Sequence, residues 1–464
     1  MTTPSVISSP IPSARALSVD WAAKLGHVCT AGDPLIQDML AGFQAPDGVD
    51  AVERPAGDLR HVNTSGVPPL CHVIAVGGSF ASVPNVLAPQ KVLGFVKVAA
   101  AAVDVAELEK LDSPVVNPEL IRRFVTDGGD AHATVLPVCN VRIPGHTLLQ
   151  TVRHALLATF RHFQGGALYD TLEFLVSYGW NPDAAPWRQG SRHRPRFPCP
   201  FCESMVFFPR HRKEFRCHGC AADLTLVDYL GLVTDASESS SDSAVAMNLK
   251  AVLEHLTLLT LLRGLVERGP SFHDQVLLLR DGPLMFRGGA ARLVEPVRAY
   301  LRFLDAQGVP FFLAGVEREG SFPSHRDQLA ALAAGGDGGT AGRVFVPHNR
   351  YILERIKHAG GASAVYGRRG LYGSKLFCRL DERGRDLFVL SLPNRRHDFD
   401  HFAPDPTADD LVGLPHVLAT LRRLVSRHFP GIPLPIVVVE RLQSLSRQPV
   451  NDLLKWLEER QSSL

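Results

Sequence analysis

Residues 246–283 read AMNLKAVLEHLTLLTLLRGLVERGPSFHDQVLLLRDGP, and this stretch decides the fold. A long apolar helix is predicted from about Ala246 to Glu267, ending at Gly269-Pro270. The apolar run Val276–Leu279 then predicts a buried strand that leads directly into Asp281-Gly282-Pro283. A long helix followed at once by a buried strand is typical of α/β proteins, in which helices cover a sheet.

The flanking sequence continues this pattern. His72–Val76 is a short apolar run, and Gly77-Gly78-Ser79 predicts a turn after it. The other predicted strands are Leu93–Val105, Ala133–Cys139, Val309–Val316 and Leu387–Leu392. The other predicted helices are Pro144–Phe163, Ala167–Tyr178, Pro296–Gln307, Leu411–His428 and Val450–Gln461. This order predicts a mixed α/β fold.

Changes in composition divide the chain into four segments. Residues 1–65 are predicted to form an N-terminal arm and an irregular lead-in, and residues 66–190 the first part of the α/β domain. Residues 191–235 hold a cysteine-rich insertion, followed by the Ser-rich connection Asp235–Ser243. Residues 244–464 are predicted to complete the α/β domain.

The overall composition excludes several classes of protein. The chain has 464 residues, 45% of them hydrophobic, and a formal net charge of +2, which excludes a disordered chain and a wholly basic nucleic-acid coat. No uninterrupted apolar run of about 18 residues is present, so no membrane span is expected. The N-terminus does not resemble a secretory signal, and eight cysteines are few. We therefore expect a cytoplasmic protein.

Two Cys-x-x-Cys pairs form the strongest local motif. Cys199 and Cys202 are separated from Cys217 and Cys220 by 14 residues. Four thiolates on two tight knuckles satisfy tetrahedral zinc, so this spacing predicts a structural zinc ribbon. Metal-free reduced cysteines or a redox pair are the alternatives. A closed four-sulfur site has no open coordination position, so we expect no catalysis there.

Arginines surround the cysteine pairs. Trp187–Arg216 contains eight lysines and arginines against two glutamates. Such a cluster is suited to the phosphate backbone of DNA, and a solvated basic surface is the alternative. The candidate nucleic-acid-binding residues are Arg192, Arg194, Arg196, Arg210 and Arg212.

Two carboxylates are candidates for a second metal site. Asp281 follows a buried strand, a common position both for a metal ligand and for a turn residue. Glu254 lies in a helix that is apolar on nearly every face, where a charge is costly unless it is paired or metal-bound. The alternative for Glu254 is pairing with Lys250 or His255 at the surface. No phosphate-binding Gly-x-x-x-x-Gly-Lys motif occurs, so we expect no ATP hydrolysis by this chain.

Taken in order, these segments resemble the NurA nuclease family, in particular the larger bacterial members with a zinc ribbon insertion. The resemblance covers roughly Cys71 to the C-terminus. It rests on these stretches: Leu93–Val105, the ribbon with LTLVDYLGL (Leu224–Leu232), Val252–Phe286, AGVEREGSF (Ala314–Phe322), VYGRRGLYGSKLF (Val365–Phe377) and LPIVVVERLQSLSRQP (Leu434–Pro449). It implies a ribonuclease H-like mixed sheet flanked by helices.

The resemblance also implies a site for two manganese or magnesium ions. In the family, an Asp on the first strand, a Glu on the helix and an Asp on a later strand hold the metal, and the last two correspond to Glu254 and Asp281. Gly77 stands where the family has the first Asp. The family's Lys after the Gly-Val strand corresponds to Arg318. Its C-terminal Tyr and His fall on Ile432 and Glu440.

The sequence therefore supports two hypotheses. The first is a dimeric DNA end-processing nuclease subunit that docks on a HerA-type hexameric ATPase in DNA repair or phage defence. In this enzyme Glu440 or Asp104 replaces the missing ligand, and the retained Glu254 and Asp281 favour activity. The second is a catalytically degenerate, zinc-containing DNA-binding or scaffold subunit of the same assembly. Gly77 is the residue that separates the two.

Overall fold

The computed structural model describes residues 56–84, 92–109, 129–177, 195–209, 212–235, 244–333, 342–358, 364–380, 387–398, 401–425, 429 and 431–444. The predicted arm at the N-terminus, the Ser-rich connection after Asp235 and the predicted helix Val450–Gln461 lie outside these residues.

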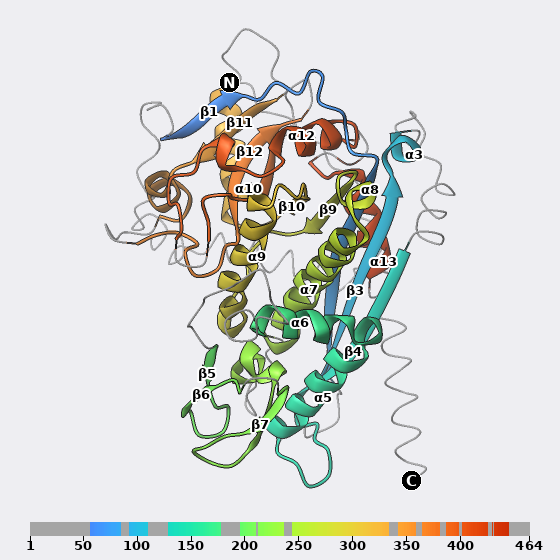
Figure 1. Cartoon of the computed structure of the whole chain (residues 1–464), viewed down its shortest axis with the longest axis vertical. Helices are drawn as coiled ribbons and strands as arrows, with labels where there is room; N and C mark the ends of the chain where they lie inside the picture. The colour runs from blue at the N-terminus through green and yellow to red at the C-terminus, as the bar shows by residue number, and fades with distance from the viewer. Residues whose placement is uncertain are drawn as a thin grey trace, which may run out of the picture. The chain divides into compact units, whose positions relative to one another are not determined.

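A nine-stranded mixed sheet forms the centre of the described fold (Figure 1). Its order is β1-β11-β12-β13-β10-β9-β2-β3-β4. The strands are β1 (Gly57–His61), β2 (His72–Pro84), β3 (Val92–Asp104), β4 (Gly129–Cys139), β9 (Val276–Asp281), β10 (Phe312–Glu317), β11 (Arg343–Pro347), β12 (Gly373–Arg379) and β13 (Leu387–Pro393). β9 pairs in parallel with both β2 and β10, and the remaining neighbours are antiparallel. The predicted α/β class with a mixed sheet is confirmed.

Helices cover both faces of this sheet. One apolar cluster joins the sheet to α5 (Leu148–His162), α6 (Ala167–Ser177), α7 (Ala244–Arg268) and α9 (Val294–Ala306). A second cluster joins the opposite face to α3 (Val105–Glu109), α12 (Leu414–Arg422) and α13 (Leu434–Gln443). The remaining helices are η2 (Phe163–Gly166), η4 (Leu226–Leu230), η5 (Leu232–Asp235), α8 (Pro270–His273), η6 (Gly288–Leu293), α10 (Ser321–Ala333), α11 (Asn349–Tyr351), η7 (Ile352–Ile356) and η8 (Ala408–Asp410).

Strand alternation determines which residues face which helices. Val73 and Ala75 of β2 belong to the cluster beneath α12 and α13, whereas Val76 belongs to the cluster beneath α7. The same alternation on β9 places Leu277 and Leu279 beneath α12 and α13, and Leu278 beneath α7. Asp281 therefore belongs to the α13 face and Arg280 to the α7 face.

α7 is the long helix predicted from the opening stretch. It ends at Arg268, where Gly269 takes a φ of 95° and Pro270 begins the next helix. By length and composition α7 could span a membrane, but 67% of its most apolar window is buried inside the described fold. It is the central core helix of this α/β architecture.

Two predictions near the N-terminus were wrong. The lead-in predicted to be irregular contributes β1, which pairs with β11. The predicted turn at Gly77-Gly78-Ser79 lies inside β2, where these residues pair with Ala99, Val98 and Lys97 of β3. Both glycines serve close packing instead: a side chain on Gly77 would meet Gln443, and one on Gly78 would meet Glu254.

Candidate functional site

The four cysteines of the two pairs converge on one point. All four Sγ atoms lie within 4.8 Å of one another. Sγ of Cys199 is 3.7 Å from that of Cys220, and Sγ of Cys202 is 3.6 Å from that of Cys217. A tetrahedron with metal–sulfur bonds of about 2.3 Å has edges of about 3.8 Å, whereas a disulfide needs sulfurs about 2.05 Å apart. The cluster therefore fits a zinc ion, as predicted.

Two short hairpins with matching turns position these sulfurs. β5 (Arg196–Pro198) pairs with β6 (Met205–Phe207), and β7 (Glu214–Arg216) pairs with β8 (Asp223–Thr225). Each turn closes with a left-handed residue that is not glycine, Glu203 with a φ of 59° and Ala221 with a φ of 58°. In each turn a backbone N–H, from Phe201 or Gly219, points at a cysteine sulfur 3.4–3.5 Å away. Such amides stabilise thiolates in a zinc knuckle.

The sulfurs differ in their acidity before metal binds. Burial raises the pKa of the Cys199 thiol to about 12. Hydrogen bonds from Ser204 lower the pKa of Cys202 to about 6. Zinc binding must displace the protons that the thiols hold before the metal binds, so zinc affinity falls as the pH falls.

The ribbon packs into the main core. Phe197, Phe208, Phe215 and Tyr229 make edge-to-face and tilted contacts, with Phe208 and Phe215 ring centroids 5.0 Å apart. Arg153 of α5 also joins this helix to the ribbon segment, because it donates to both oxygens of the buried Asp228, at 2.6 and 2.7 Å. The small aromatic core and this bidentate ion pair both hold the ribbon against the main fold.

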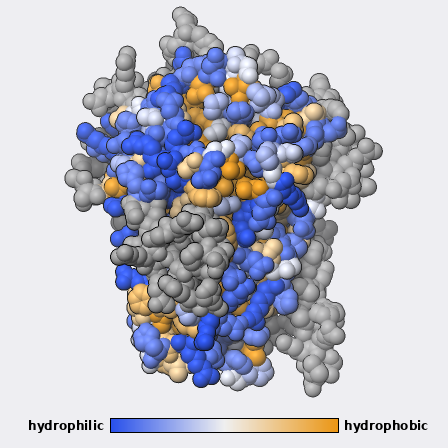
Figure 2. Space-filling model, in the orientation of Figure 1, coloured by the Kyte–Doolittle hydropathy of each residue, from blue (hydrophilic) through white to orange (hydrophobic). Residues whose placement is uncertain are grey.

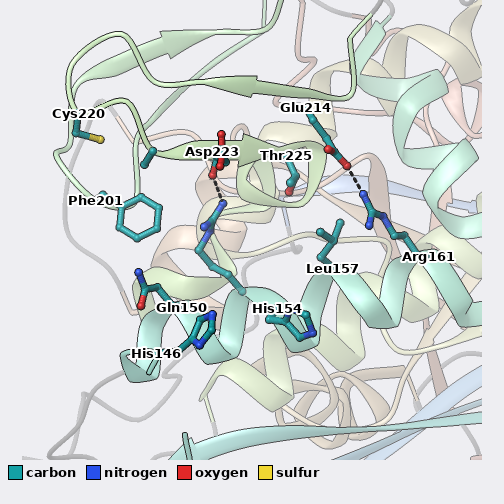
Figure 3. A pocket seen from close by; sticks show the side chains of 12 residues that line it. His146, Gln150, His154, Leu157, Arg161, Phe201, Glu214, Cys220, Asp223 and Thr225 are labelled. Carbon is teal, nitrogen blue, oxygen red and sulfur yellow. Dashed lines mark hydrogen bonds and ion pairs between the residues drawn. The ribbon is translucent and has the colours of Figure 1, made fainter. Parts of the chain in front are cut away.

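A pocket of about 600 Å³ lies between α5 and the ribbon (Figure 3). Residues on one face of α5 form its floor, and the ribbon forms its roof. The charged residues that line it are compensated: Arg161 pairs with Glu214, and Asp223 pairs with Arg216. The pocket therefore carries little net charge, and the neutral polar residues Gln150, His146 and His154 also line it.

Of the five candidate DNA-binding arginines, Arg196 and Arg212 lie within the described residues and are exposed. Neither has an ion-pair partner in the part of the chain that the structure describes. The candidates Arg192, Arg194 and Arg210 lie outside the described residues. The neighbouring Lys213 pairs with Glu173 at 2.6 Å.

Asp281 is held by an arginine. Arg318 Nε and Nη2 donate to its two oxygens at 2.9 and 2.8 Å, and Arg318 Nη1 lies 3.5 Å from Glu440 Oε1. Gln443 covers the remaining side: its Nε2 lies 3.5 Å from Asp281 Oδ2, and its Oε1 occupies the space in front of Gly77. Glu440 therefore does face this site, but through Arg318.

Glu254 belongs to a different cluster on the other face of the sheet. Its side chain is fully buried, Arg280 Nη2 contacts Oε2 at 2.5 Å, and Lys250 Nζ lies 3.2 Å from Oε1. Because Arg280 and Asp281 are neighbours on β9, their side chains point to opposite faces, and Glu254 follows Arg280. The predicted pairing with Lys250 is present, although the site is buried and not at the surface.

The described residues do not gather three of the predicted carboxylates at one point. Among the described residues, only the four cysteines place three or more His, Cys, Asp or Glu ligand atoms within 4.8 Å of one another. Asp104 is the other predicted replacement. It lies five residues along β3 from Ala99, which pairs with Gly77, so Asp104 is about 17 Å along the strand from this pair. It pairs with His72 and accepts a hydrogen bond from the Glu107 N–H.

Sequence reasoning named Arg318 but missed Arg280 and Gln443. Arg280 and Asp281 are adjacent in the sequence, so strand alternation would have shown that the α7 face receives an arginine. Nothing in the local pattern around Gln443 identifies it as the residue that fills the space at Gly77. Comparison of the chain with protein-family models and with curated proteins finds no match in either case.

A buried histidine next to Glu254 gives a pH-dependent prediction. His255 Nε2 donates to the Met285 carbonyl at 2.9 Å, and the Tyr372 hydroxyl lies 2.6 Å from Nδ1. Burial foremost, and then the positive charge of Arg280, lower the pKa of His255 well below its ordinary value of 6.5. Folded protein thus binds fewer protons here than unfolded protein, so stability falls as the pH drops below about 6.5.

Below about pH 6.5, we expect this histidine to lower the free energy of unfolding by about 1.4 kcal/mol per pH unit. Urea unfolding at pH 7 and at pH 5.5 measures it. The wild type should lose about 1.3 kcal/mol more over this interval than the His255→Gln variant, because only one pH unit of it lies below 6.5. The exposed His154→Gln should follow the wild type. If the free energy of unfolding falls equally with pH in the wild type and in His255→Gln, the assignment of His255 as a buried neutral side chain is contradicted.

Proposed function

We propose that this chain is a NurA-like, zinc-containing DNA-binding subunit whose nuclease site is inactive. The observation that carries the inactivity is the fork of Arg318 on both oxygens of Asp281. The guanidinium occupies one lone pair on each oxygen of this carboxylate, and its positive charge repels a divalent cation.

The arrangement of the central strands supports a ribonuclease H-like core. β2, β3 and β4 form an antiparallel meander, and β9 and β10 follow beside β2 and parallel to it. α7, which carries Glu254, precedes β9 with only the short α8 between them, and it packs over β2 and β3. Of the stretches named above, Leu93–Val105 falls on β3, Val252–Phe286 on α7 and β9, and Ala314–Phe322 on β10.

The residues present do not fit a two-metal centre. Gly77 supplies no ligand, and the space beside it is filled by Gln443. Glu254 forms its ion pairs on the other face of the sheet. Manganese or magnesium catalysis needs carboxylates that converge on a shared ion, so we derive no cleavage step from these side chains.

The partners follow from the same resemblance. DNA, a HerA-type hexameric ATPase and a second copy of the chain are the proposed partners, in a cytoplasmic complex for DNA repair or phage defence. The sequence contains no phosphate-binding motif of its own, so an external motor suits it.

An active nuclease is the second candidate. Glu440 is half exposed and 3.5 Å from Arg318, which is itself partly exposed. If Arg318 moves aside, Asp281 and Glu440 remain as an acidic pair that a metal ion could approach. This candidate requires manganese-dependent cleavage that depends on Asp281.

DNA binding tests the proposed function. Zinc-loaded full-length protein should bind labelled DNA without added magnesium or manganese, and affinity should fall steeply with salt. Replacing Arg196 and Arg212 together by alanine should reduce the log–log salt slope by about 1.5 units, because each phosphate contact releases about 0.7–0.9 counterions. The exposed Arg268→Ala at the end of α7 is the matched control. Absence of DNA binding would overturn the proposal.

A further inference from the structure

The outer face of the first ribbon hairpin is unusually apolar. Along β5 and β6, Phe197 pairs with Val206, and both point inward with 0% and 1% exposure. The outward positions are Arg196, Met205 and Phe207, which we call the outer ribbon face. Met205 is 46% exposed and Phe207 48% exposed.

These outward residues lie side by side across the hairpin. Arg196 is directly opposite Phe207, and Met205 is opposite Pro198. Cross-strand partners have Cβ atoms about 4.5–5.5 Å apart, so a guanidinium and an aromatic ring share one small surface. Hydrophobic residues are exposed at the end of the molecule that carries β5 and β6 (Figures 1 and 2).

The charge of the ribbon identifies the kind of partner. Arg196 and Arg212 are exposed, while the carboxylates of Glu214 and Asp223 are engaged by arginines. Glu203, in the turn, is exposed and forms no ion pair with an arginine among the described residues. An aromatic ring beside arginines suits a strand with accessible bases and a phosphate backbone.

We propose that the outer ribbon face binds single-stranded nucleic acid, with an unpaired base stacked on Phe207 and a neighbouring phosphate on Arg196. Met205 supplies a polarisable apolar surface beside that base. Duplex DNA hides its base faces within the helical stack, so it gains only the arginine contact. This inference rests on the proposed DNA-binding function and adds the form of nucleic acid that the ribbon selects.

Fluorescence anisotropy with the zinc-loaded full chain tests this inference. The probes are a short labelled oligothymidylate and a labelled duplex. Phe207→Ala should weaken oligothymidylate binding about tenfold, the scale of one lost base stack, and should change duplex binding by less than about twofold. Phe207→Trp should retain the wild-type affinity. Zinc content must be unchanged in each variant.

The chain offers matched controls. Phe272→Ala removes an aromatic side chain of 47% exposure on α8, and Met247→Ala removes a methionine of 47% exposure on α7. Both should leave oligothymidylate binding unchanged, whereas Met205→Ala should weaken it severalfold.

Three results would overturn this inference. In the first, Phe207→Ala does not change oligothymidylate binding, while the salt dependence through Arg196 and Arg212 persists. This result would rule out the base stack on Phe207 and leave the proposed DNA-binding function intact. Equal weakening of single-stranded and duplex binding would show that Phe207 does not stack on a base. If Phe207→Ala loses affinity only for a purified HerA-type ATPase, the outer ribbon face is a protein-docking surface.

Discussion

Replacing Cys199 with serine is expected to abolish stoichiometric zinc binding. The wild type should carry about one zinc per chain, because two Cys-x-x-Cys knuckles close one tetrahedral site. Cys199 is almost fully buried and lies 3.7 Å from Cys220, so its loss removes an interior corner of that tetrahedron. Structural zinc sites contribute about 10–16 kcal/mol of binding energy, which here is largely the folding energy of the ribbon.

Elemental analysis measures the zinc content, and limited trypsin digestion measures the folding. Arg212 and Arg216 lie in the second half of the ribbon, so cleavage after them should be slow in the wild type and fast in Cys199→Ser. The exposed Cys71 is the matched control, and Cys71→Ser should retain its zinc. A zinc-free wild type with four freely titratable native thiols would rule the ribbon out.

Replacing Glu254 with leucine is expected to destabilise the protein by about 3–5 kcal/mol. Arg280 is 5% exposed, and its partner Glu254 is fully buried. Removing one member of a buried pair leaves the other charge uncompensated in the core, whereas replacing both by apolar residues is often neutral. The double variant Glu254→Leu/Arg280→Met should therefore regain most of the loss.

Urea unfolding distinguishes a Glu254 that forms an ion pair from a Glu254 that is a metal ligand, because replacing it changes the free energy of unfolding in opposite directions. Carboxylates gathered for a metal repel one another in metal-free protein, so removing one stabilises the fold. Glu267, on the same helix and 69% exposed, is the control, and Glu267→Gln should change stability by less than about 0.5 kcal/mol. A Glu254→Leu variant as stable as the wild type would contradict the ion-pair assignment.

The elements that could be predicted from the sequence are those with strong local patterns. α7 and β9 follow from the apolar run and its stop at Gly269-Pro270, and β3 spans Val92–Asp104 where Leu93–Val105 was predicted. The ribbon geometry follows from cysteine spacing alone, because four sulfurs with one metal preference leave little freedom.

The carboxylate site could not be predicted in the same way. Gly77-Gly78 carries the local signal of a turn, but these residues are glycine because α13 and α7 approach β2 from its two faces. A charge on Glu254 in an apolar helix requires a partner. That partner is Arg280, the residue next to Asp281 in the sequence, which the sequence analysis did not identify. Which residues meet across the sheet depends on tertiary packing of segments more than 100 residues apart, as with Gln443 and Asp281.

The most direct test of the central claim is manganese-dependent cleavage of labelled DNA by the zinc-loaded wild type and by Asp281→Ala. With Asp281 engaged by Arg318, and Glu254 engaged by Arg280 on the other face, both proteins should cleave no more than the buffer control. Manganese-dependent cleavage by the wild type that Asp281→Ala abolishes would contradict this account and would establish an active nuclease.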